Sequence, residues 1–128
     1  MNILFLDDNG TRQKWFKSEL PSAICVWNSG EAIVELGNLN IEWDYVFLDH
    51  DLGDEVYVDS TRKDTGAEVA RYIAAQQPKI GLVVIHSFNH DGAKEMLHTL
   101  RTAKYYTSRA MFGSELFKDI IKNIQTKN

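Results

Sequence analysis

The stretch WDYVFLDHDLG, at residues 43–53, decides the fold. Residues 45–48 are four apolar side chains in a row, which is typical of a strand buried on both faces inside a parallel sheet. The run ends in three ionisable residues, Asp49, His50 and Asp51. Because open α/β sheets bind ligands just beyond the carboxyl ends of their strands, this triplet is a candidate site. The alternative is a solvated strand end with turn-forming Asp and Gly residues.

Similar apolar runs recur along the chain and are separated by segments with helical periodicity. Strands are predicted at residues 3–6, 23–27, 45–49 and 80–85, with a weaker one within 105–112. The first helix is predicted over residues 12–20, with Thr11 as its cap, and the second from a cap at 28–31 to about residue 37. The third begins at Thr65 and ends before Pro78, the fourth follows Gly92, and the fifth begins at Ser114. Five strands that alternate with five helices through right-handed crossovers predict an α/β fold. Its sheet is doubly wound, five-stranded and parallel, in strand order 2-1-3-4-5.

Length and composition indicate one ordinary globular domain over residues 1–128, with 44% hydrophobic and 25% charged residues. The net charge of −4 argues against a protein that coats nucleic acid through bulk electrostatics, since affinity for phosphates comes largely from Lys and Arg. Cys25 is the only cysteine, so an intrachain disulfide is excluded. Neither a signal peptide nor a membrane span precedes the first strand, and we expect a cytoplasmic protein without membrane contact.

The strand order brings several acids to one edge of the sheet. Strands 1, 3 and 4 are neighbours in this order, so the residues that follow them should converge. Carboxylates gathered at one edge repel each other unless a cation or protons intervene, and hard oxygen ligands suit Mg²⁺ or Mn²⁺. The expected ligands are Asp7, Asp8 and Asp49, with Asp51 as a possible fourth.

Two histidines at the same edge suggest acid–base chemistry. His50 and His86 follow neighbouring strands, and adjacent strands lie about 4.8 Å apart. One imidazole could accept a proton from water while the other protonates a leaving alkoxide, with Asp49 or Asp51 orienting one ring. The alternative for each is a structural histidine with its hydrogen bonds satisfied. Gly92 opens a helix whose free amides could hold a phosphate.

The topology, the Asp7-Asp8 pair and the strand-final Asp49 resemble the receiver domains of two-component systems. In those domains the acid pair binds Mg²⁺ and the later Asp accepts a phosphoryl group. Two features depart from that pattern. The fourth strand ends in His86-Ser87 instead of Thr or Ser followed by a small residue. The Lys that usually ends the fifth strand before Pro has no counterpart there, because Lys104 precedes the predicted strand.

The sequence is more similar to the cyclic-phosphate processing receiver domains, which are receiver- or flavodoxin-like in fold. The likeness rests on LDHDLG at residues 48–53, Thr65-Gly66 at a helix start, and the HSxN block at 86–89 with Gly92 and Met96 behind it. Asp7-Asp8 followed by Arg12 fits as well, whereas His90 stands where the pattern tends to have Pro. The resemblance implies processing of cyclic phosphates, in RNA repair or nucleotide signalling.

We therefore expect a phosphoesterase that acts on a cyclic nucleotide or on an RNA end with a cyclic phosphate. The expected partner is a phosphorylated small molecule or nucleotide, and neither bulk DNA nor a membrane. Two alternatives stay open: a stand-alone receiver phosphorylated on Asp49, and a non-catalytic module that binds a nucleotide or a protein. The expected catalytic residues are His50, His86, Asp49 and Asp51, and the expected substrate-binding residues are Arg12, Ser87, Asn89, Gly92 and Thr65.

Overall fold

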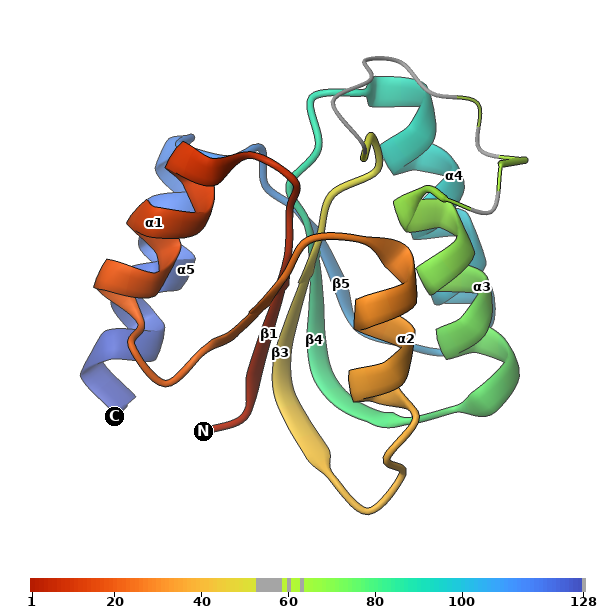
Figure 1. Cartoon of the computed structure of the whole chain (residues 1–128), viewed down its shortest axis with the longest axis horizontal. Coiled ribbons are helices and arrows are strands. Elements are labelled where there is room, and N and C mark those ends of the chain that lie inside the picture. Colours follow the sequence, from red (N-terminus) through yellow and green to blue (C-terminus); the bar gives the residue numbers. More distant parts are fainter. Residues whose placement is uncertain (53–58, 60, 63, 128) are drawn as a thin grey trace.

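The computed structural model describes residues 1–52, 59, 61–62 and 64–127. Across this part of the chain, five parallel strands form one sheet in the order β2-β1-β3-β4-β5, and five helices connect or follow them (Figure 1). The elements are β1 (Ile3–Leu6), α1 (Gly10–Glu19), β2 (Ile24–Val26), α2 (Ser29–Leu36), β3 (Glu42–Leu48), α3 (Gly66–Gln76), β4 (Lys79–Ile85), α4 (His90–Thr102), β5 (Thr107–Arg109) and α5 (Glu115–Lys127). The predicted fold class and strand order are confirmed.

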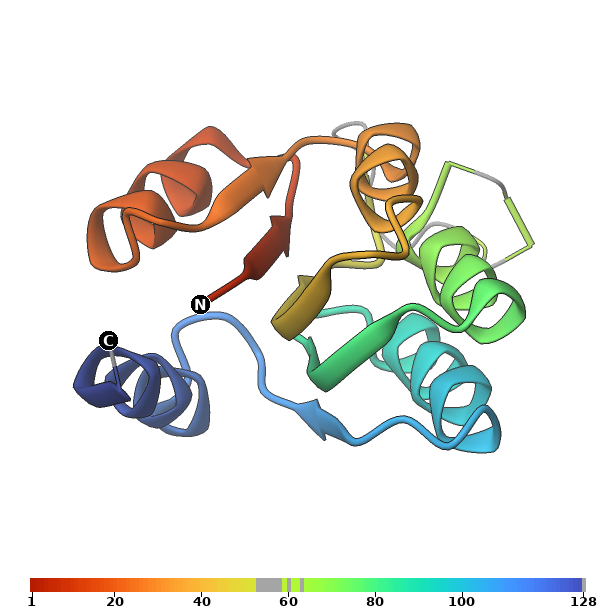
Figure 2. The same cartoon turned by 90° about the horizontal axis from the view of Figure 1, so that it is seen from below.

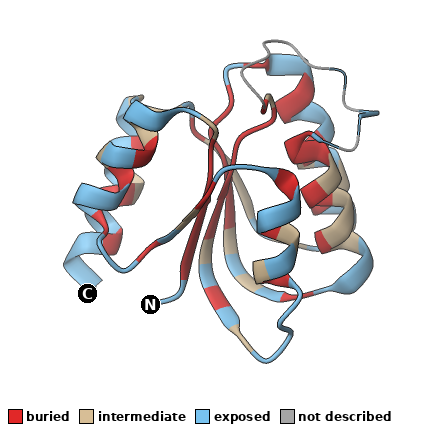
Figure 3. Cartoon of the chain, viewed as in Figure 1, coloured by how far each residue is buried: buried red, intermediate tan, exposed pale blue. Residues whose placement is uncertain are grey.

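Helices cover both faces of the sheet. α1 and α5 pack on one face, and α2, α3 and α4 pack on the other (Figures 1 and 2). Alternate strand residues enter two separate cores: Phe5, Phe47 and Val84 face α1 and α5, whereas Leu6 and Leu48 face the three other helices. All four residues of β1 are buried, as are the last three of β3 and of β4 (Figure 3). Continuous apolar runs are what a sheet covered on both faces requires.

The first helix begins earlier than the sequence predicts. Its cap is Asn9, whose side chain accepts a hydrogen bond of 2.9 Å from the backbone N–H of Arg12, so α1 begins at Gly10. Thr11, the predicted cap, is the second residue of the helix. Asn is at least as good a cap as Thr because its side-chain oxygen reaches the same free amide. The fifth strand lies within the predicted window but spans only three residues.

The carboxyl ends of the strands lie at one edge of the sheet, and both chain ends lie at the opposite edge (Figure 1). Among the described residues, none of the helices is long and apolar enough to cross a membrane.

Candidate functional site

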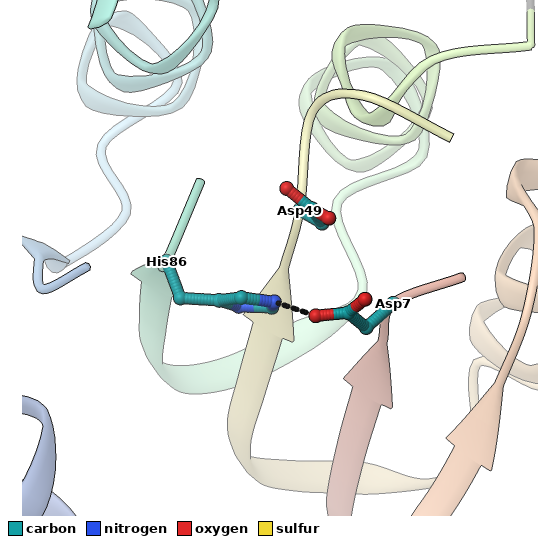
Figure 4. Close-up of side chains that lie close together, drawn as sticks. All are labelled: Asp7, Asp49 and His86. Atoms are coloured by element: carbon teal, nitrogen blue, oxygen red, sulfur yellow. Dashed lines mark hydrogen bonds and ion pairs between the residues drawn. The ribbon is translucent and has the colours of Figure 1, made fainter. Parts of the chain in front are cut away.

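The central side chains of the site come from three residues that lie side by side on neighbouring strands, each just past the end of its strand. Leu6 of β1 pairs with Leu48 of β3, which in turn pairs with Ile85 of β4. The next residues along each strand are Asp7, Asp49 and His86, which we call the acid–histidine row. Because they share a register, their side chains leave the sheet on the same face, the face covered by α1 and α5. Ligand atoms of all three lie within 4.8 Å of one another (Figure 4).

Asp7 is a fully buried carboxylate with donors on both oxygens. Oδ1 accepts hydrogen bonds from the Asn9 backbone N–H at 2.8 Å and from Arg12 Nη2 at 3.0 Å. Oδ2 accepts from Arg12 Nε at 2.7 Å and lies 3.1 Å from His86 Nε2. Burial raises the pKa of Asp7, but the hydrogen bonds with His86 and Arg12 outweigh it and leave that pKa below its usual value of 3.8. Asp7 is therefore a charged, fully engaged acid.

Asp49 has a different environment although it is the next acid in the row. It is 5% exposed, and its Oδ1 accepts a hydrogen bond of 2.8 Å from the His50 backbone N–H. Burial raises the pKa of Asp49 to about 6, with the charge of Asp7 acting in the same direction and the charges of His86 and Arg12 only partly opposing it. Near neutral pH this carboxyl can therefore both accept and release a proton, which an ordinary aspartate cannot do.

Arg12 is the cation that joins the two acids. Its guanidinium binds Asp7 through two nitrogens, and Nη2 lies 3.6 Å from Oδ2 of Asp49. The guanidinium carbon also lies 6.0 Å from the ring centroid of Phe88 and 5.9 Å from that of Phe112. Arg12 keeps its charge: burial lowers its pKa, but the hydrogen bonds to Asp7 more than compensate and raise it. One face of α1 thus brings a positive group to the acid–histidine row.

His86 is held by aromatic side chains on the same face. Its ring stacks on Phe5 at a centroid distance of 5.0 Å and meets Phe112 and Phe117 at steeper angles. Nε2 is the nitrogen directed at Asp7 (Figure 4). Nδ1 is buried and has no hydrogen-bond partner within the described part of the chain. This packing fixes the ring plane and directs Nε2 to the row.

His50 belongs to a second group, which lies at the start of α4 and which we call the His50 group: His50, Asp51 and Asn89. His50 Nδ1 lies 2.8 Å from Asp51 Oδ1, and Asn89 Nδ2 donates to the same oxygen at 2.9 Å. Asn89 Oδ1 accepts from the Gly92 backbone N–H at 2.9 Å and so caps α4. The group ties the end of β3 to the first turn of α4.

The structure does not bring His50 and His86 together as an acid–base pair, which corrects the arrangement expected from the sequence. His86 is in register with Asp49, so His50 comes one residue later and faces the opposite side of the sheet. His86 packs on Phe5, and His50 packs against Gly92 on the other side. The period of two places His50 and Asp49 on opposite faces, but only the register between β3 and β4 shows that His86 lies on the face of Asp49.

The remaining predicted site residues lie around these two groups. Asp8 is half-buried and is not among the described residues whose ligand atoms come within 4.8 Å. Ser87 is buried, and its Oγ accepts a hydrogen bond from the Asn89 backbone N–H at 3.0 Å. Thr65 is buried and donates its hydroxyl to the Arg62 carbonyl. Both hydroxyls thus make local bonds that hold loops. Gly53, the last residue of the LDHDLG motif, lies outside the described residues.

Sequence reasoning missed Phe88, Phe112 and Arg109. Arg109 ends β5, where it pairs with Ile85 and so lies one residue before the acid–histidine row, and its Nη2 donates to the Ser87 carbonyl at 2.8 Å. Burial lowers the pKa of its guanidinium. A basic residue therefore does end the fifth strand. The signal was hidden because a three-residue strand has no periodicity that fixes its limits.

Substitution of Gly92 by alanine should destabilise the protein by about 2 kcal/mol, the cost of overpacking a buried site. A Cβ at Gly92 would lie 2.5 Å from Cγ of His50, whose ring is fully buried and held by Asp51. Gly10→Ala is the matched control, because the nearest atom to its new Cβ is 4.0 Å away. Denaturant unfolding should show a loss only for Gly92→Ala. Equal stability of the two variants would contradict the close packing of His50.

Three solved structures share this fold. A response regulator receiver domain (CheY-like) from Methylobacillus flagellatus aligns with a TM-score of 0.66 at 18% identity, covering 100% of this chain and 98% of that chain. A response regulator from Colwellia psychrerythraea gives 0.65 at 11% identity, with 99% and 98% covered. The signal receiver domain of a putative LuxO repressor protein from Vibrio parahaemolyticus gives 0.63 at 14% identity, with 98% and 93% covered. At these identities the likeness defines the class: a receiver fold.

The sequence is more specific than the fold. Residues 2–102 match the model of the cyclic-phosphate processing receiver domain family, and the chain belongs to that family. A comparison with curated protein sequences finds no match.

Proposed function

We propose that this protein is a phosphoesterase that opens a cyclic phosphate, carried by a nucleotide or by an RNA end. The observation that carries the proposal is the acid–histidine row, in which a carboxyl with a pKa of about 6 lies beside a histidine and an arginine. Membership of the cyclic-phosphate processing family supports the substrate class. A charged acid and a titrating acid on one face are the pattern that acid–base catalysis of hydrolysis uses.

Each residue of the row has a distinct proposed role. Asp49 accepts a proton from the attacking water, whose oxygen forms the new bond to phosphorus. The bond from phosphorus to one ester oxygen breaks, and that oxygen takes a proton from His86. Arg12 neutralises the phosphate charge, because it is the cation that already contacts Asp49. Asp7 orients both His86 and Arg12. The His50 group then has a positioning role, since it caps α4 instead of facing the row.

The cation of this site is proposed to be Arg12 and not a divalent metal. Asp7, Asp49 and His86 are close enough for one ion to contact all three, so part of the metal site expected from the sequence is present. As these residues stand, however, they do not fit Mg²⁺ or Mn²⁺. Both oxygens of Asp7 already accept hydrogen bonds from N–H groups, and the Arg12 guanidinium fills the place between the acids. Mg²⁺ also demands near-ideal octahedral oxygen ligands.

A panel of cyclic phosphates tests the proposal: 2′,3′-cyclic nucleotides, 3′,5′-cyclic nucleotides, cyclic oligonucleotides and RNA with a cyclic end, each with Mg²⁺, Mn²⁺ or chelator. We expect turnover of at least one substrate, and no loss in chelator. His86→Gln should lower the rate by about 10²- to 10⁴-fold, the usual contribution of one acid–base residue. His98→Gln, on the exposed side of α4, is the control. A rate within threefold of wild type for His86→Gln would exclude its proposed role. Binding without turnover would favour a non-catalytic module.

The second candidate is a signalling receiver phosphorylated on Asp49. The observation in its favour is the position of Asp49 at the end of β3 in a receiver fold. Incubation with acetyl phosphate and Mg²⁺ followed by mass measurement distinguishes the two. We expect no lasting phosphoryl adduct, because His86 stands where receivers have a hydroxyl. An adduct that persists in wild type and is absent from Asp49→Asn would reverse the ranking.

A further inference from the structure

An exposed aromatic ring stands at the edge of the candidate site. Phe88 is 56% exposed, although both of its neighbours, Ser87 and Asn89, are buried. Its ring centroid lies 6.0 Å from the guanidinium carbon of Arg12, which in turn contacts Asp7 and Asp49. The ring is therefore one side chain away from the acid–histidine row. Leaving a large apolar ring in water forfeits the free energy that burial would give.

The backbone that carries Phe88 is held on both sides. The Asn89 backbone N–H donates to Ser87 Oγ at 3.0 Å, and Arg109 donates to the Ser87 carbonyl at 2.8 Å. The side chain of Asn89 binds Asp51 and caps α4. Phe88 is thus the single outward residue of an anchored turn. The anchored backbone holds Phe88 beside Arg12, which is pre-organisation of the kind that a binding surface needs.

The ligand that fits this pair of groups has an anion and a flat ring close together. Arg12 offers a positive charge beside the row, and its guanidinium lies over the ring of Phe88, which is more than half exposed. A nucleotide carries both features, since its base and its phosphate are attached to the same sugar. Stacking of a base on an aromatic side chain is worth about 1–3 kcal/mol and tolerates any base, because every base has a π face.

We propose that Phe88 is a stacking platform for the base of the substrate, so the substrates are nucleotides instead of base-free sugar phosphates. This inference rests on the proposed function, because it assumes that the phosphate lies at Arg12. It deepens that function by naming a specificity-determining residue. Because stacking reads no hydrogen-bond pattern, the four bases should be accepted with similar KM.

Two substrates separate the base from the phosphate: adenosine 2′,3′-cyclic phosphate and the 2′,3′-cyclic phosphate of methyl riboside, which lacks a base. Phe88→Ala should raise KM for the nucleotide about ten- to hundredfold, as loss of one stacked base predicts. It should leave KM for the base-free substrate unchanged. Phe88→Tyr should behave as wild type. Tyr106→Ala is the control, because Tyr106 is 79% exposed and lies just before β5, at the amino end of the strands and away from the site.

A short oligoribonucleotide with the same cyclic end, assayed in parallel, tells a free nucleotide from an RNA end. The stacking role of Phe88 is confirmed if Phe88→Ala raises KM for the nucleotide or for the oligoribonucleotide but not for the base-free substrate. Equal effects of Phe88→Ala on both 2′,3′-cyclic phosphates would overturn the inference and leave the proposed function intact. If wild type turns over neither of these nor any other cyclic phosphate of the panel, the proposed function fails instead. Calorimetric titration with adenosine 3′-monophosphate then tests the stacking role of Phe88 by itself. Weaker binding by Phe88→Ala than by wild type would confirm that role. No binding to wild type, or equal binding to wild type and Phe88→Ala, would overturn it.

Discussion

Asp49→Asn is expected to stabilise the protein at pH 7 by about 3 kcal/mol. The pKa of the Asp49 carboxyl is raised from 3.8 to about 6 in the fold, and each unit corresponds to roughly 1.4 kcal/mol. Between pH 4 and 6 the folded protein therefore binds more protons than the unfolded chain, so wild-type stability falls as pH rises through that window. The amide has no charge to bury. The gain of the variant should consequently be full above pH 6 and absent below pH 4.

The same substitution should reduce turnover by about 10²- to 10⁴-fold, because an amide cannot accept the proton of water. Denaturant unfolding of both proteins at several pH values, alongside the rate of cyclic-phosphate hydrolysis, checks the two effects together. Asp119→Asn, on the exposed side of α5, is the matched control and should change neither quantity. A variant that is less stable than wild type at pH 8 would contradict the raised pKa of Asp49.

Arg12→Gln is expected to cost about 3 kcal/mol of stability and to create a dependence on Mg²⁺. Removing one partner of a buried ion pair costs about 3–5 kcal/mol, and the partial exposure of Arg12 favours the lower end. The variant leaves Asp7 without two of its hydrogen bonds and Asp49 without a nearby arginine. A divalent cation that binds the folded state alone should then raise the melting temperature.

Wild type should melt at the same temperature with Mg²⁺, Mn²⁺ or chelator. Lys14→Gln, an exposed position on the same helix, should match wild type in both stability and metal response. Melting curves over a series of Mg²⁺ concentrations are the measurement. A strong Mg²⁺ response of wild type would show that the ion displaces Arg12, in favour of the metal site expected from the sequence.

The fold could be predicted from the sequence because its central strands are continuous apolar runs that end in polar residues. β1 and the last three residues of β3 and of β4 are buried on both faces, and a parallel sheet covered on both sides requires that pattern. Convergence of Asp7, Asp49 and His86 followed from the strand order alone. The limits of β5 did not follow, because three half-buried residues have no periodicity.

The site could be predicted only in part. The apolar runs predict which residues lie at the carboxyl ends of the strands. Which of those side chains share a face depends on the register between strands, and the register of β3 with β4 puts His50 and His86 on opposite faces. The choice between arginine and metal depends on how α1 docks. Asn9 starts the helix where it does, and that start directs Arg12 toward Asp7. A sequence shows that Arg12 is near the acids but not that its side chain occupies the space between them.

The position of the two chain ends has a practical consequence. Figure 1 shows both near the end of the sheet where the strands begin, whereas the acid–histidine row follows the ends of β1, β3 and β4. An affinity tag, a fluorescent fusion or a linker to a sensor surface can thus be attached at either end without covering the edge that carries Arg12 and Phe88. Ligand titrations on tethered protein and in free solution should then give the same dissociation constants.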